Sequence, residues 1–407
     1  MTLLSGGRQA LATGLAMVAT LAVANPAPAA AGVTGEIRYA GSATAVDGSY
    51  LVVLRDGAVG ATAGTRRAID AVPDLAAGLA RRYGGSVTRV YGAALNGFAA
   101  RLTESAAKRL AGHPDVAYVE QDRTVTANAV QRPTPSWGID RIDQRALPLN
   151  QTYNFELIAS GVRAYIIDSG MSVAHPDFSI GRATSGYDAI DGGTADDCNG
   201  HGTHVGGTVG GRQYGVAKDV KLVAVRVIAC VRPSTVSEVI AGVNWVAANA
   251  VKPAVATLAV NTSASTALDN AVGTAVTSGV TFVVSAGNDA GNACNYSPAR
   301  VPTAITVGAT SQTDQRAAWS NTGVCLDLFA PGVSITSAWY TSTAASMSAS
   351  GTSMAAAHVA GAAALVLAAN PTFTPVQVRD ALVAKAIVGI VPNPGTGSPN
   401  RLLHVGP

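Results

Sequence analysis

The stretch Gly351-Thr352-Ser353-Met354-Ala355 leads into an apolar run, residues 356–369, that reads AAHVAGAAALVLAA. A run this apolar predicts a helix that is buried on all sides in a globular core. A serine at the start of such a helix lies near backbone N–H groups that have no partner within the helix. An exposed hydroxyl beside such donors is what a nucleophile of acyl transfer requires. Serine and threonine are also common helix N-caps, so this stretch alone leaves both interpretations open.

Around this helix, the sequence from Trp137 onward alternates between predicted strands and helices. We expect strands at 162–167, 222–227, 254–260, 280–285 and 304–307, and helices at 202–210, 235–248, 266–278, 353–369 and 375–383. This alternation predicts an α/β fold with a mostly parallel sheet between helical layers, over residues 137–407. Because active residues in such sheets gather beyond the carboxyl ends of strands, Asp168 and Asn288 are expected at the same edge.

Residues 49–127 form a second, smaller predicted unit of α+β structure. Its strands are expected at 49–54, 97–102 and 116–120, and its helices at 72–83 and 105–111. Residues 32–48 are expected to be a linker. The polar, proline-containing residues 128–136 are expected to be a connector that proteases can cleave.

The amino-terminus has the pattern of a secretory signal peptide. Arg8 gives a positive start, residues 10–24 are apolar, and Ala29-Ala30-Ala31 offers a small-residue cleavage site. We expect cleavage after Ala31 and a secreted protein. The alternative, a membrane anchor, is disfavoured because the apolar run of about 15 residues is shorter than the roughly 20 that span a bilayer.

Charge and cysteine content narrow the expected partners. Only 13% of the 407 residues are charged, the net charge is +3, and no basic run occurs, so no nucleic-acid partner is expected. The four cysteines of a secreted chain favour disulfides, in any of three connectivities. A zinc site is the alternative, but no C-x-x-C spacing occurs. The cysteines are Cys198, Cys230, Cys294 and Cys325.

Four local signals carry the chemistry. A buried strand ends at Asp168 before a turn, and His201 lies between two glycines at a helix start. Another strand ends before Asn288, and Ser353 supplies a hydroxyl. The chain order Asp, His, Ser is the order found in subtilisin.

On these motifs, residues 137–403 resemble the subtilase family of serine peptidases, most closely its proteinase K and aqualysin branch. Residues 49–127 resemble the inhibitory propeptide of that family. The resemblance implies a subtilisin-like three-layer fold and a secreted serine endopeptidase made as a self-processing zymogen. Its expected partners are protein or peptide substrates and its own propeptide. The mature protein is expected to be a monomer with no membrane contact, cut near Asn128–Ala129.

The resemblance also implies residue roles. Asp168 would orient His201, and His201 would take the proton of Ser353. Asn288, with the Ser353 backbone N–H, would hold the oxyanion. His204, one turn along the helix from His201, is expected to be structural. His358 is expected to be a packed helix histidine.

The same resemblance implies two disulfides, Cys198–Cys230 and Cys294–Cys325, and no cofactor for catalysis. It also implies a structural calcium site made by the carbonyls of Pro302 and Ala304 with the Asp327 carboxylate. The alternative is a surface loop with an ordinary carboxylate.

The expected substrate-binding segments depart from the family. Ala259-Val260-Asn261-Thr262 stands where relatives have Ser-Leu-Gly-Gly, and Arg232-Pro233-Ser234 stands where they have Gly-Ser-Gly. Proline removes a backbone donor, and Asn261 and Thr262 add bulk where the pocket wall is otherwise bare. We expect an active endopeptidase with altered subsites. Two alternatives stay open: an impaired domain that binds peptides, and an esterase of small acyl substrates.

Overall fold

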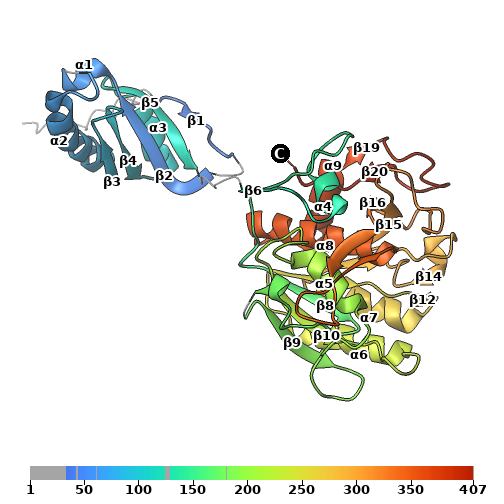
Figure 1. Ribbon diagram of the computed structural model, residues 1–407. Helices are drawn as coiled ribbons and strands as arrows, with labels where there is room; N and C mark the ends of the chain where they lie inside the picture. Colours follow the sequence, from blue (N-terminus) through green and yellow to red (C-terminus); the bar gives the residue numbers. More distant parts are fainter. Residues whose placement is uncertain (1–33, 43–44, 61, 124–128, 180, 407) are drawn as a thin grey trace, which may run out of the picture. The chain divides into compact units, whose positions relative to one another are not determined.

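The computed structural model describes residues 34–42, 45–60, 62–123, 129–179 and 181–406. These residues fall into two compact units that divide between Val125 and Thr126 (Figure 1). The expected signal peptide, residues 1–31, lies outside the described residues, and so does Asn128 of the expected maturation site.

The amino-terminal unit is a sheet with helices. Its strand order is β1-β5-β2-β4-β3, in which β1 runs parallel to β5 and the other neighbours are antiparallel. Phe98 and Val119 of the sheet pack with Leu110 of α3 in one buried core. The described elements are β1 (Ile37–Arg38), β2 (Ala45–Leu54), α1 (Asp56–Val59), α2 (Arg66–Arg82), β3 (Ser86–Tyr91), β4 (Gly97–Arg101), α3 (Glu104–Ala111) and β5 (Val116–Arg123).

This unit differs from the prediction in several features. Residues 32–48, expected to be a linker, contain β1, which pairs with β5, and the start of β2, and helix α1 was not predicted. Helix α2 starts at Arg66 and not at residue 72, because the Thr65 side chain caps it by accepting the Ala68 N–H. Strand β3 was not predicted, since most of its residues are exposed and its sequence carries little apolar alternation.

The carboxy-terminal unit is built on a mostly parallel sheet, which confirms the predicted fold class. Among the described residues, nine strands run in the order β19-β20-β16-β15-β13-β11-β8-β10-β9, and only the β19–β20 pair is antiparallel. The strands are β8 (Arg163–Asp168), β9 (Ala183–Asp188), β10 (Lys221–Arg226), β11 (Ala254–Leu258), β13 (Thr281–Ser285), β15 (Ile305–Thr310), β16 (Leu328–Pro331), β19 (Ile387–Val388) and β20 (Arg401–Leu402).

Helices cover both faces of this sheet, as alternating strand residues show. In β8, Ile166 packs into the core that contains α5 (His201–Gly210), α8 (Thr352–Ala369) and α9 (Pro375–Lys385). Its neighbours Tyr165 and Ile167 pack into the opposite core, with α6 (Val236–Asn249) and α7 (Thr266–Thr277). The period of two along the strand therefore divides the unit into three layers.

Helix α8 is the buried centre of one layer. Within the described residues it alone is long and apolar enough to cross a membrane, yet 78% of it is buried inside this unit. Its apolar composition on all sides matches a core helix that packs against α5 and against strands β13 and β15.

Short elements complete the unit. The residues expected to be an irregular connector include a strand, β6 (Ala129–Gln131), which pairs with β7 (Tyr153–Phe155). Three residues are too few for a periodic signal, so β6 was not predicted. The others are α4 (Trp137–Ile142), η1 (Pro176–Phe178), β12 (Thr262–Ser263), η2 (Ala293–Asn295), β14 (Tyr296–Ser297), β17 (Ile335–Ala338) and β18 (Ser346–Ala349).

Candidate active site

Asp168 and His201 are in direct contact at the carboxyl edge of the sheet. Asp168 is the last residue of β8 and is buried, and His201 is the first residue of α5. The His201 Nδ1 lies 2.7 Å from Asp168 Oδ1 and 2.9 Å from Oδ2. If Nδ1 carries the proton, it donates to the carboxylate and leaves Nε2 free as a proton acceptor. Because 32% of the His201 side chain is exposed, the ring is accessible.

The surroundings of His201 act on its pKa in opposite directions. Burial disfavours the imidazolium, but the charge of Asp168, its hydrogen bond and the charge of Asp197 together raise the pKa above its usual value. The ring is therefore a stronger base than an ordinary histidine.

Asp197 and Ser169 hold this pair in place, and the sequence analysis missed both roles. The two oxygens of Asp197 accept hydrogen bonds from Gly200 N (2.8 Å) and Thr203 N (2.8 Å), at the start of α5. Ser169 Oγ donates to Asp197 and accepts from Gly202 N. The side chain that follows Asp168 in the chain is thus tied to the helix that carries His201. Asp197 was detectable only as a carboxylate just before a helix start.

His204 and His358 are structural in their contacts, as expected. His204 is buried, and its Nε2 lies 2.9 Å from the Ile335 carbonyl. His358 is buried with Nδ1 2.8 Å from the Met354 carbonyl. Burial lowers the pKa of each to about 4, so both rings are neutral at physiological pH.

Ser353 is not the N-cap of α8. The N-cap is Gly351, and Ser353 is the second residue of the helix. Its hydroxyl donates to the Ala259 carbonyl at 2.8 Å, and the residue is 7% exposed. The capping interpretation therefore fails, and Ser353 sits at the positive end of the helix.

Asn288 lies against the same turn. Its Oδ1 accepts both the backbone N–H and the hydroxyl of Thr352, each at 2.9 Å. The Thr352 hydroxyl also accepts the Gly287 N–H at 3.1 Å. These bonds occupy the oxygen of the Asn288 amide and leave its NH₂ group as the free donor beside Ser353. Thr352 was not singled out from the sequence.

The backbone before Asn288 is also fixed. Gly287 has φ +101°, and a Cβ there would lie 2.3 Å from the Asn321 amide nitrogen, so only glycine fits. Asn321 Nδ2 donates to the Ala286 carbonyl, and its Oδ1 accepts from Asp289 and Gly291. Asn321 thus holds both ends of the loop that presents Asn288.

The segment 259–262 follows β11 and borders Ser353. Asn261 Nδ2 donates to the Ser285 carbonyl (2.8 Å), and Ser285 Oγ donates back to Asn261 Oδ1 (2.6 Å). Thr262 enters the short strand β12, paired with Ser297. Asn261 therefore links the ends of two neighbouring strands, β11 and β13.

The segment 232–234 is held by hydrogen bonds to residues on either side of it in the chain. The Arg232 guanidinium pairs with Glu238, and Ser234 Oγ accepts the Ala229 N–H at 2.7 Å. The Arg232 hydrogen bond lowers the pKa of Glu238 to about 2. Glu238 also closes a capping box with Thr235 at the start of α6. Pro233 lies between these bonded residues.

The two implied disulfides are present. The Cα atoms of Cys198 and Cys230 lie 5.8 Å apart, and those of Cys294 and Cys325 lie 5.5 Å apart. The first disulfide joins the loop before His201 to the turn at residues 232–234.

The residues expected to bind calcium converge on an arginine. Asp327 Oδ1 lies 2.6 Å from Nε of Arg379, whose Nη1 donates to the Pro302 carbonyl at 3.2 Å. Asp327 Oδ2 accepts the Thr306 N–H at 2.8 Å, and Ala304 directly precedes β15. Two of the three expected ligands thus face one positively charged group.

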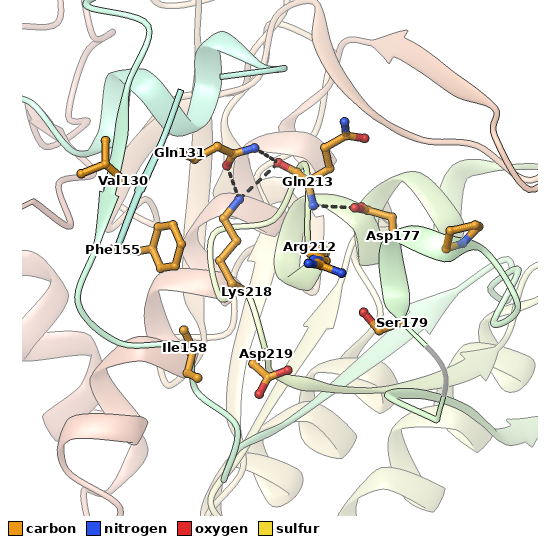
Figure 2. Close-up of a pocket in the computed structure, with 11 residues that line it drawn as sticks. Val130, Gln131, Phe155, Ile158, Asp177, Ser179, Arg212, Gln213, Lys218 and Asp219 are labelled. Carbon is orange, nitrogen blue, oxygen red and sulfur yellow. Dashed lines mark hydrogen bonds between the residues drawn. The ribbon is translucent and has the colours of Figure 1, made fainter. Parts of the chain in front are cut away.

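A separate pocket lies near the start of this unit and contains none of the expected site residues (Figure 2). Its volume is about 820 Å³, and Lys218 reaches into it from a buried position. Lys218 Nζ donates to Gln131 Oε1 (2.5 Å) and to the Gln213 carbonyl (3.2 Å). Burial lowers the pKa of Lys218 to about 7. These bonds tie strand β6 to the loop after α5, which is a structural role.

The chain matches two known protein families. Residues 159–405 match the subtilase family (peptidase S8), and residues 49–128 match the peptidase inhibitor I9 family. The chain belongs to the subtilase family. It is a subtilisin-like serine protease that carries an inhibitor-type propeptide, so the resemblance seen in the sequence is confirmed.

Three relatives illustrate the similarity of this subtilase to known proteins. The extracellular serine proteinase of Thermus sp. (strain Rt41A) is 51% identical over 322 residues, which are 79% of this chain and 78% of that protein. The cuticle-degrading serine protease of Arthrobotrys oligospora is 37% identical over 404 residues, 96% of this chain and 98% of that protein. A solved cold adapted subtilisin-like serine proteinase has a TM-score of 0.64 and 51% identity, over 66% of this chain and 97% of that chain.

The environments of three of the six histidines predict a raised titration for His201 and lowered titrations for His204 and His358. We expect the His201 ring to titrate above about 6.5, the ordinary value, and His204 and His358 to titrate near 4. NMR of the ring resonances in the Ser353→Ala protein measures all three. Asp168→Asn removes a charge that raises the His201 pKa, so that variant should lower the His201 titration more than that of His204, on which the same charge acts without a hydrogen bond. A His201 ring that titrates no higher in the parent than in this variant would contradict the assigned contact.

Proposed function

We propose that this subtilase is a secreted endopeptidase that cleaves peptide bonds through an acyl-enzyme on Ser353. The observation that carries the proposal is the shared turn at the start of α8. One residue before Ser353, Thr352 binds the Asn288 side chain, and α8 packs against α5, whose first residue is His201.

The nucleophile and base act in sequence. The Ser353 hydroxyl leaves the Ala259 carbonyl by rotation about χ1 and gives its proton to His201 Nε2 as Oγ attacks the peptide carbonyl. Asp168 keeps the proton on Nδ1 and stabilises the imidazolium that forms. His201 then protonates the leaving amine, and water hydrolyses the ester by the same route. Because only neutral His201 accepts a proton, turnover should rise with pH through the His201 titration.

The oxyanion would be held by two donors. The Ser353 N–H is among the first N–H groups of α8, which have no acceptor within the helix. The Asn288 NH₂ is directed by the two bonds that Thr352 makes to its oxygen. Both donors are fixed before the substrate arrives, which is the condition for strong transition-state stabilisation.

We expect loss of the Asn288 amide to slow turnover far more than loss of the Thr352 hydroxyl that orients it. Asn288→Ala removes a donor and should lower kcat roughly 10²–10³-fold. Thr352→Val keeps the shape of the side chain but removes one of the two bonds that orient the amide, so kcat should fall about tenfold. Steady-state kinetics on one peptide substrate measures both, with KM little changed. Equal kcat values for parent and Asn288→Ala would contradict the oxyanion role.

Secretion and self-processing are part of the proposal. The signal pattern at residues 1–31, the I9-type unit and a relative named as extracellular support an exported precursor. The catalytic unit would cut its own chain near Asn128–Ala129 and be released from the propeptide. N-terminal sequencing of the secreted parent and of the Ser353→Ala protein tests this, because only the parent should begin near Ala129.

A serine-directed fluorophosphonate tests the nucleophile. We expect an adduct on Ser353 in the purified mature protein, cleavage of denatured casein, and neither in Ser353→Ala. No adduct on Ser353 would sink the enzyme proposal and favour a peptide-binding domain. An adduct together with ester hydrolysis, but with casein intact, would favour the esterase alternative.

The substrate segments support an altered specificity. In the family, the segments equivalent to 232–234 and 259–262 hold the extended substrate as added strands. Here both the nitrogen and the oxygen of the Asn261 amide are hydrogen-bonded to Ser285. Ser285 lies three residues before Asn288 in the chain. Space for a substrate side chain between the ends of β11 and β13 is thereby reduced. We therefore infer a preference for small residues on the acyl side of the cleaved bond.

Asn261→Gly should relax this preference. Removal of the amide opens the space above Ser285, so kcat/KM for a peptide with phenylalanine at the cleaved position should rise about tenfold relative to alanine. Matched chromogenic peptides measure the ratio. Ala264→Gly is the control, because Ala264 is exposed and lies two residues beyond the segment 259–262. An unchanged ratio in Asn261→Gly would show that this amide does not set the preference.

A further inference from the structure

A single carboxylate anchors a cationic site beside α9. Asp327 is 6% exposed, and its two oxygens serve different partners. One accepts the Thr306 N–H at the start of β15, and the other contacts Arg379 of α9. A carboxylate this buried is stabilised where hydrogen bonds and an opposite charge replace the water that it has lost.

The Arg379 guanidinium bridges two of the groups that the family resemblance assigns to calcium. Its Nε contacts Asp327 Oδ1 at 2.6 Å and its Nη1 donates to the Pro302 carbonyl at 3.2 Å. A carboxylate and a main-chain carbonyl are hard oxygen donors that suit calcium. Their convergence on one cation shows that the residues present fit a positive ion. The guanidinium occupies the position where that ion would take its ligands.

A calcium ion and the guanidinium would compete for these oxygens. Calcium at the Asp327 oxygen would lie within a few ångström of a guanidinium and would take the same lone pairs. Arg401 adds a second positive charge that acts on Asp327 through space. A site with one carboxylate and two nearby arginines is therefore weak for a divalent ion.

We propose that Arg379 is the resident cation of this site in the calcium-free protein and competes with calcium for Asp327 and the Pro302 carbonyl. Calcium binds only after the arginine swings out, which its 38% exposed side chain permits. The affinity for calcium is then reduced by the stability of the ion pair. In exchange, the loop before β15 stays tied to α9 when calcium is scarce.

Calcium binding to the full chain tests the competition. The Ser353→Ala background prevents self-digestion, and it makes the result independent of the proposed catalytic role. Titration calorimetry with calcium chloride is run on the parent, on Arg379→Gln and on the same proteins with Asp327→Asn, which identifies the Asp327-dependent site among any others. We expect Arg379→Gln to tighten that site about tenfold or more, because the competing charge is gone.

Thermal unfolding gives a second readout. In EDTA, Arg379→Gln should melt about 3 °C below the parent, and saturating calcium should restore it. Arg401→Gln is the matched control, since it removes an equal charge that makes no hydrogen bond to Asp327 among the described contacts. Arg401→Gln should change the calcium affinity and the melting temperature in EDTA much less than Arg379→Gln does. Arg379→Lys keeps the charge without the two-point contact and should lie between the parent and Arg379→Gln.

Three results would overturn the proposed role of Arg379. Calcium affinity that is unchanged or weaker in Arg379→Gln would overturn the competition, and an unchanged melting temperature in EDTA would overturn the resident role. If no variant shows calcium binding that depends on Asp327, the site takes no calcium and the proposal falls. Casein cleavage is not among the readouts, so failure here leaves the proposed peptidase function untouched.

Discussion

The two hydrogen bonds from Thr352 to Asn288 join the central helix to the edge of the sheet, and the candidate site depends on them. They use the N–H group at the start of α8 and the adjacent hydroxyl, and both are accepted by one amide oxygen. A helix start with unpaired donors is costly when buried. Here the same bonds that satisfy the helix also direct the Asn288 NH₂ and fix the position of Ser353. Folding and the proposed chemistry thus use one set of contacts.

Three buried carboxylates of this unit, Asp314, Asp168 and Asp327, contact charged or titratable partners that differ in exposure. The fully buried Arg141 contacts both oxygens of Asp314, at 2.6 and 3.1 Å, and also donates to the Gln144 carbonyl. Such a two-point pair has no room for exchange with water and serves packing. Asp168 instead faces a ring that is one-third exposed and can change its charge. Asp327 is closer to the Asp168 case, since 38% of the side chain of its partner Arg379 is exposed. The buried carboxylates thus differ most in how freely their partners move or titrate.

The sequence predicted the layers well because they depend on local periodicity. Alternating residues of β8 face two different cores, and α8 is apolar on every side, so both follow from the pattern of side chains. The predicted helix boundaries at α5, α6 and α7 were within one residue for the same reason. Strands β1, β3, β6, β9 and β16 were among those missed, because short or exposed strands gain their stability from pairing partners far away in the chain.

The site residues also divide into those that a local motif marks and those whose roles depend on contacts between distant segments. Asp168, His201, Asn288 and Ser353 follow strand ends or open helices, so motifs in the sequence marked them. Thr352, Asp197 and Asn321 were not marked, because their roles are hydrogen bonds to segments that only the folded chain brings near. Arg379 is a similar case, 52 positions beyond Asp327 in the chain. A helix arginine carries no sign in sequence that it faces a carbonyl and a carboxylate.

The departures at 232–234 and 259–262 now have a physical interpretation. In both segments the added side chains satisfy neighbouring groups: Asn261 bonds Ser285, and Ser234 accepts the Ala229 N–H. A glycine-rich segment would leave these polar groups for water or substrate. Under the proposed function, a peptide that docks here would meet polar groups that are partly bonded already, and its binding would then draw more on shape than on new polar contacts. In this proposal, Ser353, His201 and Asn288 carry out the reaction, and the segments 232–234 and 259–262 select the substrate. Selectivity could then change while the three reacting residues keep their geometry.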